Sequence, residues 1–144
     1  MKSLVFIGGG NMASCIVSGI VQCNNKNLQI TVCDPNQDKL EVLREKFGVN
    51  ISTSNGKAVS EADIVILAVK PQSIRKIILE LKNKFKSSVI IISIAAGITT
   101  NAIKSWLDSP FAIIRAMPNT PSSILSGATG LYADSTVDNK AKKQ

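Results

Sequence analysis

Histidine is absent from this sequence of 144 residues. Its absence excludes Ser-His-Asp and Cys-His catalysis, metal sites that use imidazole, and an imidazole general acid. Aromatic residues make up only 4% of the chain. A core must therefore consist mainly of Ile, Val, Leu and Ala, which is typical of buried parallel strands rather than of a β-sandwich. The hydrophobic content of 44% is enough for one domain with a genuine core.

Long hydrophobic runs are missing as well. No segment approaches the roughly 18 apolar residues of a membrane span, and the apolar run at residues 4–7 is too short for a signal peptide. The three cysteines, Cys15, Cys23 and Cys33, are odd in number and lack C-x-x-C spacing. We therefore expect free thiols, no metal site, no membrane contact and a cytoplasmic location.

Acidic residues are outnumbered by basic ones, and the net charge is +7. Several Lys and Arg residues lie between positions 70 and 86, which raises the question of nucleic-acid binding. Aromatic residues are not interleaved with them, and Ile74 and Ile78 stand at helical spacing in the same stretch. The pattern favours a helix with a solvated basic face over a nucleic-acid interface. The positive field would still favour an anionic cofactor or substrate.

Short apolar runs alternate with amphipathic stretches along the chain. The runs have almost no period-two alternation, as expected for strands with helices on both faces. This arrangement predicts an α/β fold of the Rossmann type, with a doubly wound, mostly parallel sheet. The expected strands are residues 4–7, 28–33, 64–69, 89–94 and 111–114.

Two of the intervening helices carry clear boundary signals. Asn36 is a plausible N-cap for a helix that Gly48 ends, and Ser73 is a plausible start for the helix after Pro71. Residues 138–144 are polar and prone to form a helix but offer no apolar face. We therefore expect one domain over residues 1–137, followed by a polar tail.

A glycine pattern, Gly8-x-Gly10-x-x-Ala13, follows the first apolar run and opens a helix. Gly8 permits a tight turn, Gly10 lets the backbone approach a pyrophosphate, and the small Ala13 lets the helix pack on the strand. The helix N-terminus supplies amide donors for phosphates. Asp34, at the end of the second expected strand, can accept from both ribose hydroxyls of a dinucleotide. A turn or cap role before Pro35 is the alternative for Asp34.

The residues after the later strands are the next candidates, because ligands of open α/β sheets bind at the carboxyl ends of strands. Lys70 can meet the nicotinamide ribose or an anionic substrate, or can simply face solvent. The small residues Ala95, Ala96 and Gly97 leave room for a flat ring, although a tight turn into a helix explains them almost as well. Asn119 can hydrogen-bond a carboxamide, or can merely close its loop.

Four stretches together resemble the pyrroline-5-carboxylate reductase family. They are Phe-Ile-Gly-Gly-Gly-Asn-Met-Ala at 6–13, Ala-Val-Lys-Pro-Gln at 68–72, Ile-Ala-Ala-Gly-Ile at 94–98 and Ile-Ile-Arg-Ala-Met-Pro-Asn-Thr-Pro at 113–121. The resemblance extends from about residue 3 to residue 132. It implies an oxidoreductase of proline biosynthesis, in which NADPH or NADH reduces the ring imine of 1-pyrroline-5-carboxylate to L-proline.

The resemblance also implies an NAD(P)-binding role for particular residues. Besides Asp34 and the nearby Asn36, the implied contacts follow the cofactor from the pyrophosphate, through the adenosine side, to the nicotinamide. They are Gly8, Gly10, Asn11 and Met12, then Asn55, then Ala68, Val69, Lys70 and Pro71, then Ala95, Ala96 and Gly97, and finally Met117, Asn119 and Thr120. It identifies no catalytic acid or base, so the catalytic residues are unknown at this stage.

The sequence departs from the family pattern in two ways. Members that prefer NADPH commonly have a small hydroxyl residue where this chain has Asp34, whose carboxylate would repel a 2′-phosphate. Asn36 and Lys39 partly offset that repulsion, and we expect NADH to be used at least as well as NADPH. The second departure is length, because the all-helical C-terminal domain of the family, which makes the dimer and most of the substrate pocket, is absent.

Two functional hypotheses follow from these departures. The first is the cofactor-binding portion of a reductase, which binds cofactor but turns over little substrate, and which forms a homo-oligomer only with the C-terminal domain. The polar tail at 138–144 would then be the start of a linker or helix toward that domain. The alternative is a stand-alone dinucleotide-binding sensor or interaction module.

Overall fold

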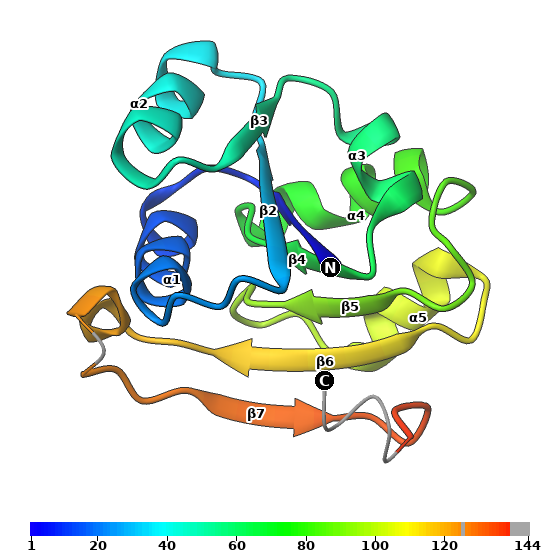
Figure 1. Ribbon diagram of the computed structural model, residues 1–144. Coiled ribbons are helices and arrows are strands. Elements are labelled where there is room, and N and C mark those ends of the chain that lie inside the picture. Colours follow the sequence, from blue (N-terminus) through cyan, green and yellow to red (C-terminus); the bar gives the residue numbers. More distant parts are fainter. Residues whose placement is uncertain (125, 139–144) are drawn as a thin grey trace.

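The computed structural model describes residues 1–124 and 126–138 of the chain (Figure 1). Its strands are β1 (Lys2–Ile7), β2 (Leu28–Cys33), β3 (Asn50–Ser52), β4 (Ile64–Leu67), β5 (Ile90–Ser93), β6 (Ala112–Met117) and β7 (Gly130–Ala133). Its helices are α1 (Asn11–Gln22), α2 (Gln37–Phe47), α3 (Asn55–Glu61), α4 (Pro71–Leu81) and α5 (Thr100–Leu107), with a 3-10 helix η1 (Thr120–Ile124).

The strands form one sheet in the order β3-β2-β1-β4-β5-β6-β7. Every neighbouring pair is parallel except β6 and β7, which are antiparallel. The chain builds outward from β1 in one direction, then crosses to β4 and builds in the other. The expected α/β class with a doubly wound, mostly parallel sheet is confirmed. Such a reversal leaves a crevice at the carboxyl ends of the two central strands, here β1 and β4.

Each of the five expected strands is present, with ends that differ by a few residues. The expectation that Ser73 opens the following helix was wrong, because α4 begins at Pro71 with Lys70 as its N-cap. Proline suits the first helical position, since its fixed φ is helical and its missing N–H would have no partner there. Asn36 does cap α2, accepting from the Lys39 N–H at 3.0 Å, and Gly48 ends that helix with a φ of 67°.

The core lies on both faces of the sheet because the side chains of each strand alternate. In β1, Val5 and Ile7 pack toward the face that α3, α4 and α5 cover. Leu4 and Phe6 pack toward the other face, which α1 and α2 cover. The side chains on both faces of β1 are therefore buried away from water, which explains its unbroken apolar run in the sequence.

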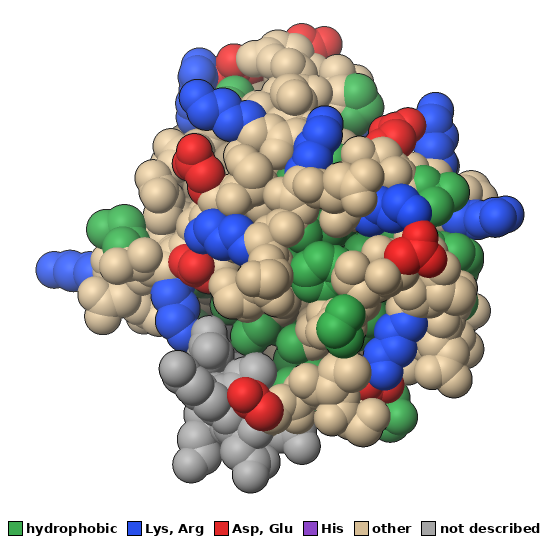
Figure 2. Space-filling view, turned by 90° about the vertical axis from the view of Figure 1, so that its right-hand side faces the viewer, with side chains coloured by type: hydrophobic (Ala, Val, Ile, Leu, Met, Phe, Trp, Pro, Cys, Tyr) green, Lys and Arg blue, Asp and Glu red, His purple; other side chains and the backbone are tan. Residues whose placement is uncertain are grey.

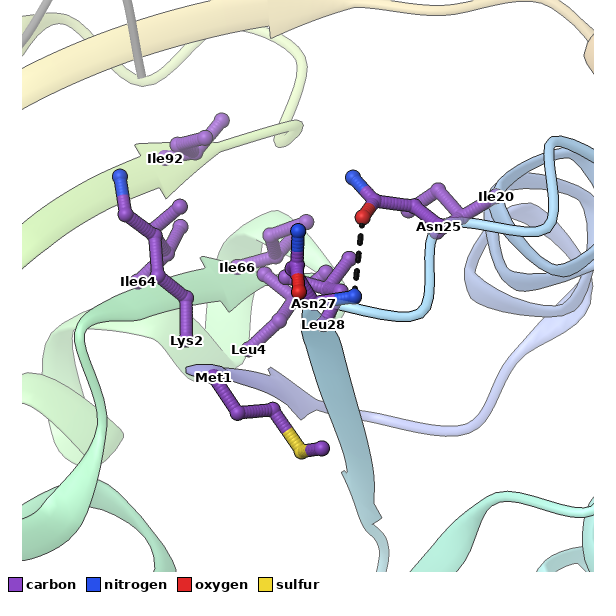
Figure 3. Close-up of a pocket in the computed structure, with 10 residues that line it drawn as sticks. All are labelled: Met1, Lys2, Leu4, Ile20, Asn25, Asn27, Leu28, Ile64, Ile66 and Ile92. Carbon is purple, nitrogen blue, oxygen red and sulfur yellow. Dashed lines mark hydrogen bonds between the residues drawn. The ribbon is translucent and has the colours of Figure 1, made fainter.

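The second face is covered unevenly. Next to α1, over the starts of β1 and β2 and along β4 and β5, lies an apolar trough with a volume of about 490 Å³ (Figure 3). Most of its lining is aliphatic, with a few polar residues from the N-terminus and from the turn before β2. The lining residues are Met1, Lys2, Leu4, Ile20, Asn25, Asn27, Leu28, Ile64, Ile66 and Ile92. The structure describes no helix lying over this part of the sheet.

The basic stretch between residues 70 and 86 forms α4 and the turn after it. Ile74 and Ile78 are buried in the core, while Arg75 and Lys76 are exposed. On the face drawn in Figure 2, the Lys and Arg side chains stand apart from one another, with carboxylates between them, rather than in one stripe. None of the helices in the described part of the chain is long and apolar enough to cross a membrane.

A buried carboxylate fastens the segment after β7 to α5. Asp134, only 6% exposed, accepts from Lys104 Nζ at 2.5 Å and from the Thr136 N–H at 2.9 Å. Its own N–H donates to the Ile113 carbonyl at 3.3 Å, and Val137 is buried just beyond it. The Lys104 ammonium and the Thr136 N–H lower the pKa of Asp134 from the ordinary 3.8 to about 2.

We expect Asp134→Asn to lower the urea midpoint of unfolding at pH 7. A lowered pKa in the folded state contributes stability above about pH 4 that disappears as the pH falls toward 2. The gap between wild type and variant should therefore close between pH 4 and pH 2. Asp108→Asn is the matched control, because Asp108 is 67% exposed in its pair with Lys82 and should matter little. Equal shifts in both variants would contradict this account.

Candidate functional site

Residues 8–10, called the glycine loop from here on, connect β1 to α1. Gly8 has a φ of 104°, and its N–H donates to the Cys33 carbonyl at 2.7 Å. A Cβ on Gly8 would lie 2.6 Å from the Ala68 carbonyl oxygen and 2.9 Å from Val69 Cγ1. Both the left-handed backbone and the contact with the end of β4 therefore require glycine at this position.

Gly10 stands in a different environment, although it belongs to the same loop. It is the N-cap of α1, with φ −75° and ψ −177°, a conformation open to any residue. A Cβ on Gly10 would meet no atom within 4 Å. Nothing in the fold demands glycine here, so the missing side chain leaves free space directly above a helix N-terminus.

The N-terminus of α1 is open to an anion. The cap makes no side-chain hydrogen bond, and the first turn of α1 contains no acidic residue. The first amides of a helix have no partner within the helix and carry its positive dipole end. The open space at Gly10 and these amides together form a cradle that fits a phosphate or pyrophosphate group.

Asp34 lies beside the glycine loop, where both of its carboxylate oxygens accept backbone N–H groups. Oδ2 accepts from Gly9 and Oδ1 from Asn36, each at 2.9 Å. Of the turn or cap role that was the alternative for Asp34, the turn is therefore present in the structure, whereas the N-cap of α2 is Asn36. Gly9 itself was not among the predicted site residues, because no pattern in the sequence shows which side chain receives its N–H.

The end of β4 packs against the glycine loop. The Ala68 N–H donates to the Ile7 carbonyl at 2.8 Å, which continues the pairing of β1 and β4 by one residue. Ala68 and Val69 are half-buried, while Lys70 and Pro71 are exposed where α4 begins. This edge therefore presents a small apolar wall followed by one exposed ammonium.

The ends of β5 and β6 lie farther along the same edge of the sheet. Ala95 is buried, whereas Ala96 and Gly97 are exposed, and a Cβ on Gly97 would point into open space. Asn119 Oδ1 accepts from the Ala128 N–H at 2.9 Å. The loop-closing role that was the alternative for Asn119 is thus what its oxygen performs.

The loop after β6 approaches the first helix. η1, which begins at Thr120, packs against α1, and Met117 is 48% exposed just before it. Arg115 precedes Met117 on β6. Its Nε is buried and has no hydrogen-bond partner in the described part of the chain.

The remaining predicted position, Asn55, begins α3 after the short strand β3 and is half-buried. It lies at the same carboxyl edge as the glycine loop, but on the far side of β2. The sheet order places the end of β6 on the opposite side of β1. The predicted residues therefore line one edge of the sheet, across its width, rather than a single enclosed pocket.

The cysteines of the chain lie near the site or elsewhere as free thiols. Cys33, the last residue of β2, is buried, and burial raises the pKa of its thiol to about 11. All three cysteines are free. Within residues 1–124 and 126–138, no three His, Cys, Asp or Glu side chains are grouped to hold a metal ion. The open N-terminus of α1 is suited to binding a phosphate-containing ligand.

The sheet order, the glycine loop and the open helix N-terminus define a nucleotide-binding domain of the Rossmann class. Residues 3–97 match the protein family described as "NADP oxidoreductase coenzyme F420-dependent". The chain belongs to this family.

Named relatives make the comparison more specific. A pyrroline-5-carboxylate reductase from Pseudomonas aeruginosa is 37% identical over 134 residues, which are 93% of this chain and 49% of the relative. A solved pyrroline-5-carboxylate reductase from Coxiella burnetii superposes with a TM-score of 0.91 and 43% identity, covering 99% of this chain and 53% of that one. A Plasmodium falciparum pyrroline carboxylate reductase with NADP bound gives a TM-score of 0.84 and 26% identity, covering 99% and 52%.

The shares of the relatives' length that this chain covers agree with one another. The chain spans about half the length of the curated relatives it matches. Almost all of this chain takes part in each match, and the resemblance to pyrroline-5-carboxylate reductases is confirmed.

Two alanine substitutions in the glycine loop should differ in their effect on the free energy of unfolding. Gly8→Ala forces a Cβ against the Ala68 carbonyl at a positive φ, and we expect it to lose at least about 2 kcal/mol of unfolding free energy. Gly10→Ala meets no atom and should change the free energy of unfolding by no more than about 0.5 kcal/mol, because the entropic gain from alanine is offset by its poorer N-capping of α1. Urea denaturation followed by circular dichroism measures both. Similar losses in the two variants would contradict the distinction between them.

Proposed function

We propose that this chain is the cofactor-binding portion of a pyrroline-5-carboxylate reductase, an oxidoreductase that uses NAD(P)H to reduce the C=N bond of 1-pyrroline-5-carboxylate and form L-proline. The observation that carries the proposal is the open N-terminus of α1 above Gly10, in a chain that matches reductases of this name along nearly its full length.

The roles of the individual residues are part of the proposal. The first amides of α1, at Asn11 and Met12, hold the pyrophosphate, and the missing side chain of Gly10 makes room for it. Asp34 and Asn36 lie on the side of the adenosine ribose, with Asn55 beyond them. The exposed Lys70 offers a positive charge near the crevice.

We assign the opposite end of the cofactor to the residues that follow β5 and end β6. The small residues Ala95 to Gly97 leave space for the nicotinamide ring, and the turn from Met117 to Thr120 forms the adjoining wall. When bound, the nicotinamide supplies the hydride for reduction of the imine. The residues of this chain bind and orient the cofactor, and the proposal assigns no proton donor among them.

The chain on its own is proposed to bind cofactor without appreciable turnover. It spans about half the length of its relatives, and we assign the substrate carboxylate site and the homo-oligomer contacts to the other half. Residues 1–137 would form the domain and 138–144 the tail leading onward. All of this tail except Asp138 lies outside the described residues. The three free thiols support a reducing compartment, and we propose the cytoplasm.

Titration with NADH, followed by nicotinamide fluorescence, tests the proposal directly. Wild-type chain should bind NADH with a Kd in the micromolar range, on the order of the affinities common for enzyme substrates. Gly10→Val places a side chain in the pyrophosphate space and should weaken binding at least about 10-fold, with an unchanged unfolding midpoint. Gly130→Val is the matched control, since a Cβ there also meets open space but lies on β7.

The same samples should be assayed for reduction of 1-pyrroline-5-carboxylate. Binding without turnover is the expected result for this chain alone. Full turnover would refute the assignment of the substrate site to the other half. No binding by the wild-type chain would refute the cofactor role.

The second proposal concerns the choice between the two cofactors. We assign the Asp34 carboxylate to the place where the 2′-phosphate of NADPH would approach, and two like charges in a partly buried site repel each other. We expect the Kd for NADPH to be equal to or higher than that for NADH, with the ratio falling as salt is added. Parallel titrations at low and moderate ionic strength measure it. A strong preference for NADPH under both conditions would contradict the expectation.

A further inference from the structure

We propose that Asp34 is a positioning residue that sets the shape of the glycine loop through the N–H of Gly9, before any ligand arrives. This inference rests on the proposed cofactor role of the loop. It adds an action of Asp34 that needs no contact with the ribose at all.

The contact between Asp34 and the loop is part of a set of ties to the end of β2. The Gly8 N–H donates to the Cys33 carbonyl at 2.7 Å, and the Gly9 N–H donates to Asp34 Oδ2 at 2.9 Å. Two consecutive amides of the loop are thus held by two consecutive residues at the end of β2. The Asp34 N–H in turn donates to the Ser52 carbonyl at 3.2 Å, which anchors Asp34 to β3.

The second oxygen of the same carboxylate fixes Asp34 from the other side. Oδ1 accepts from the Asn36 N–H at 2.9 Å, at the N-cap of α2. The side chain is therefore held between the glycine loop and α2. Hydrogen bonds from backbone amides to a carboxylate are charge-assisted and stronger than those to a neutral acceptor.

Gly9 lies close to the side chains of Leu43 and Asp34. A Cβ on Gly9 would lie 3.2 Å from Leu43 Cδ1 and 3.5 Å from the Asp34 Cβ. Gly9 is buried, with its N–H directed at Asp34 rather than at the crevice. The Asp34 carboxylate thus accepts the Gly9 N–H. The N–H groups that follow Gly10 remain for a phosphate.

A tether of this kind matters because the loop consists of three glycines in succession. Glycine has more backbone freedom than any other residue, and ordering it on ligand binding costs conformational entropy. Holding Gly9 in place beforehand removes part of that cost and so raises affinity for the pyrophosphate. The effect should appear with any ligand that occupies the N-terminus of α1, including one that has no ribose.

Inorganic pyrophosphate is the probe that separates this role from a ribose contact. Asp34→Asn keeps the size of the side chain but turns one of its two acceptors into a donor facing an N–H. If charge alone mattered, loss of a negative charge beside the loop would strengthen pyrophosphate binding. If Asp34 positions the loop, the same substitution should weaken it. The two roles therefore predict opposite changes in the affinity for pyrophosphate.

The measurements are calorimetric titrations with pyrophosphate and with NADH, and hydrogen exchange of the Gly9 amide by NMR. We expect Asp34→Asn to weaken both ligands by a similar factor, on the order of 10-fold for one charge-assisted hydrogen bond. The Gly9 amide should exchange at least about 10-fold faster in the free variant. Asp38→Asn makes the same change of charge on the first turn of α2 and should move none of these values. Circular dichroism confirms folding, and Asp34→Ala serves as a second variant.

Unchanged or tighter pyrophosphate binding, with Gly9 exchange as in wild type and weaker NADH binding, would overturn the inference and leave Asp34 as a ribose contact. The proposed cofactor role would survive that result. Absence of NADH binding by the wild-type chain would overturn both.

Discussion

The contact between Gly8 and the end of β4 is the constraint on which the rest of the site depends. With 2.6 Å between a Cβ at Gly8 and the Ala68 carbonyl oxygen, the two central strands meet too closely for any side chain. The chain must leave β1 with a positive φ and turn immediately into α1. This turn places the N-terminus of α1 at the crevice where the sheet order reverses, so a steric condition at one residue sets the direction of the helix that offers its amides.

Much of the fold could be predicted from the sequence because burial leaves a direct trace in it. The five apolar runs became strands, since parallel strands covered on both faces need apolar side chains at most positions. β3 and β7 left no such trace. β3 has three residues, two of them polar, and Leu131 and Tyr132 of β7 are 71% and 60% exposed at the sheet edge. Pairing with a neighbouring strand, rather than burial, makes these two segments extended.

The candidate site was predictable in its position but not in its hydrogen bonds. Glycine spacing and strand ends indicate which residues reach the carboxyl edge of the sheet. They do not show that Asp34 accepts from Gly9, 25 positions earlier, or that Asn119 accepts from Ala128. Those contacts depend on the distance between loops in the folded chain. For both residues the sequence also allowed a structural role, a turn for Asp34 and loop closure for Asn119. The structure contains a hydrogen bond of that kind in each case.

The apolar trough runs along the central strands that lead to the glycine loop. Leu4 lines the trough near the start of β1, and Gly8 follows its end at Ile7. Five rises of about 3.3 Å separate Lys2 from Ile7, which is roughly 17 Å. Ile66 also lines the trough, however, and it pairs with Phe6, two residues before Gly8. The trough therefore extends from the start of β1 to the level of Phe6, so this apolar surface and the glycine loop are neighbours along one strand.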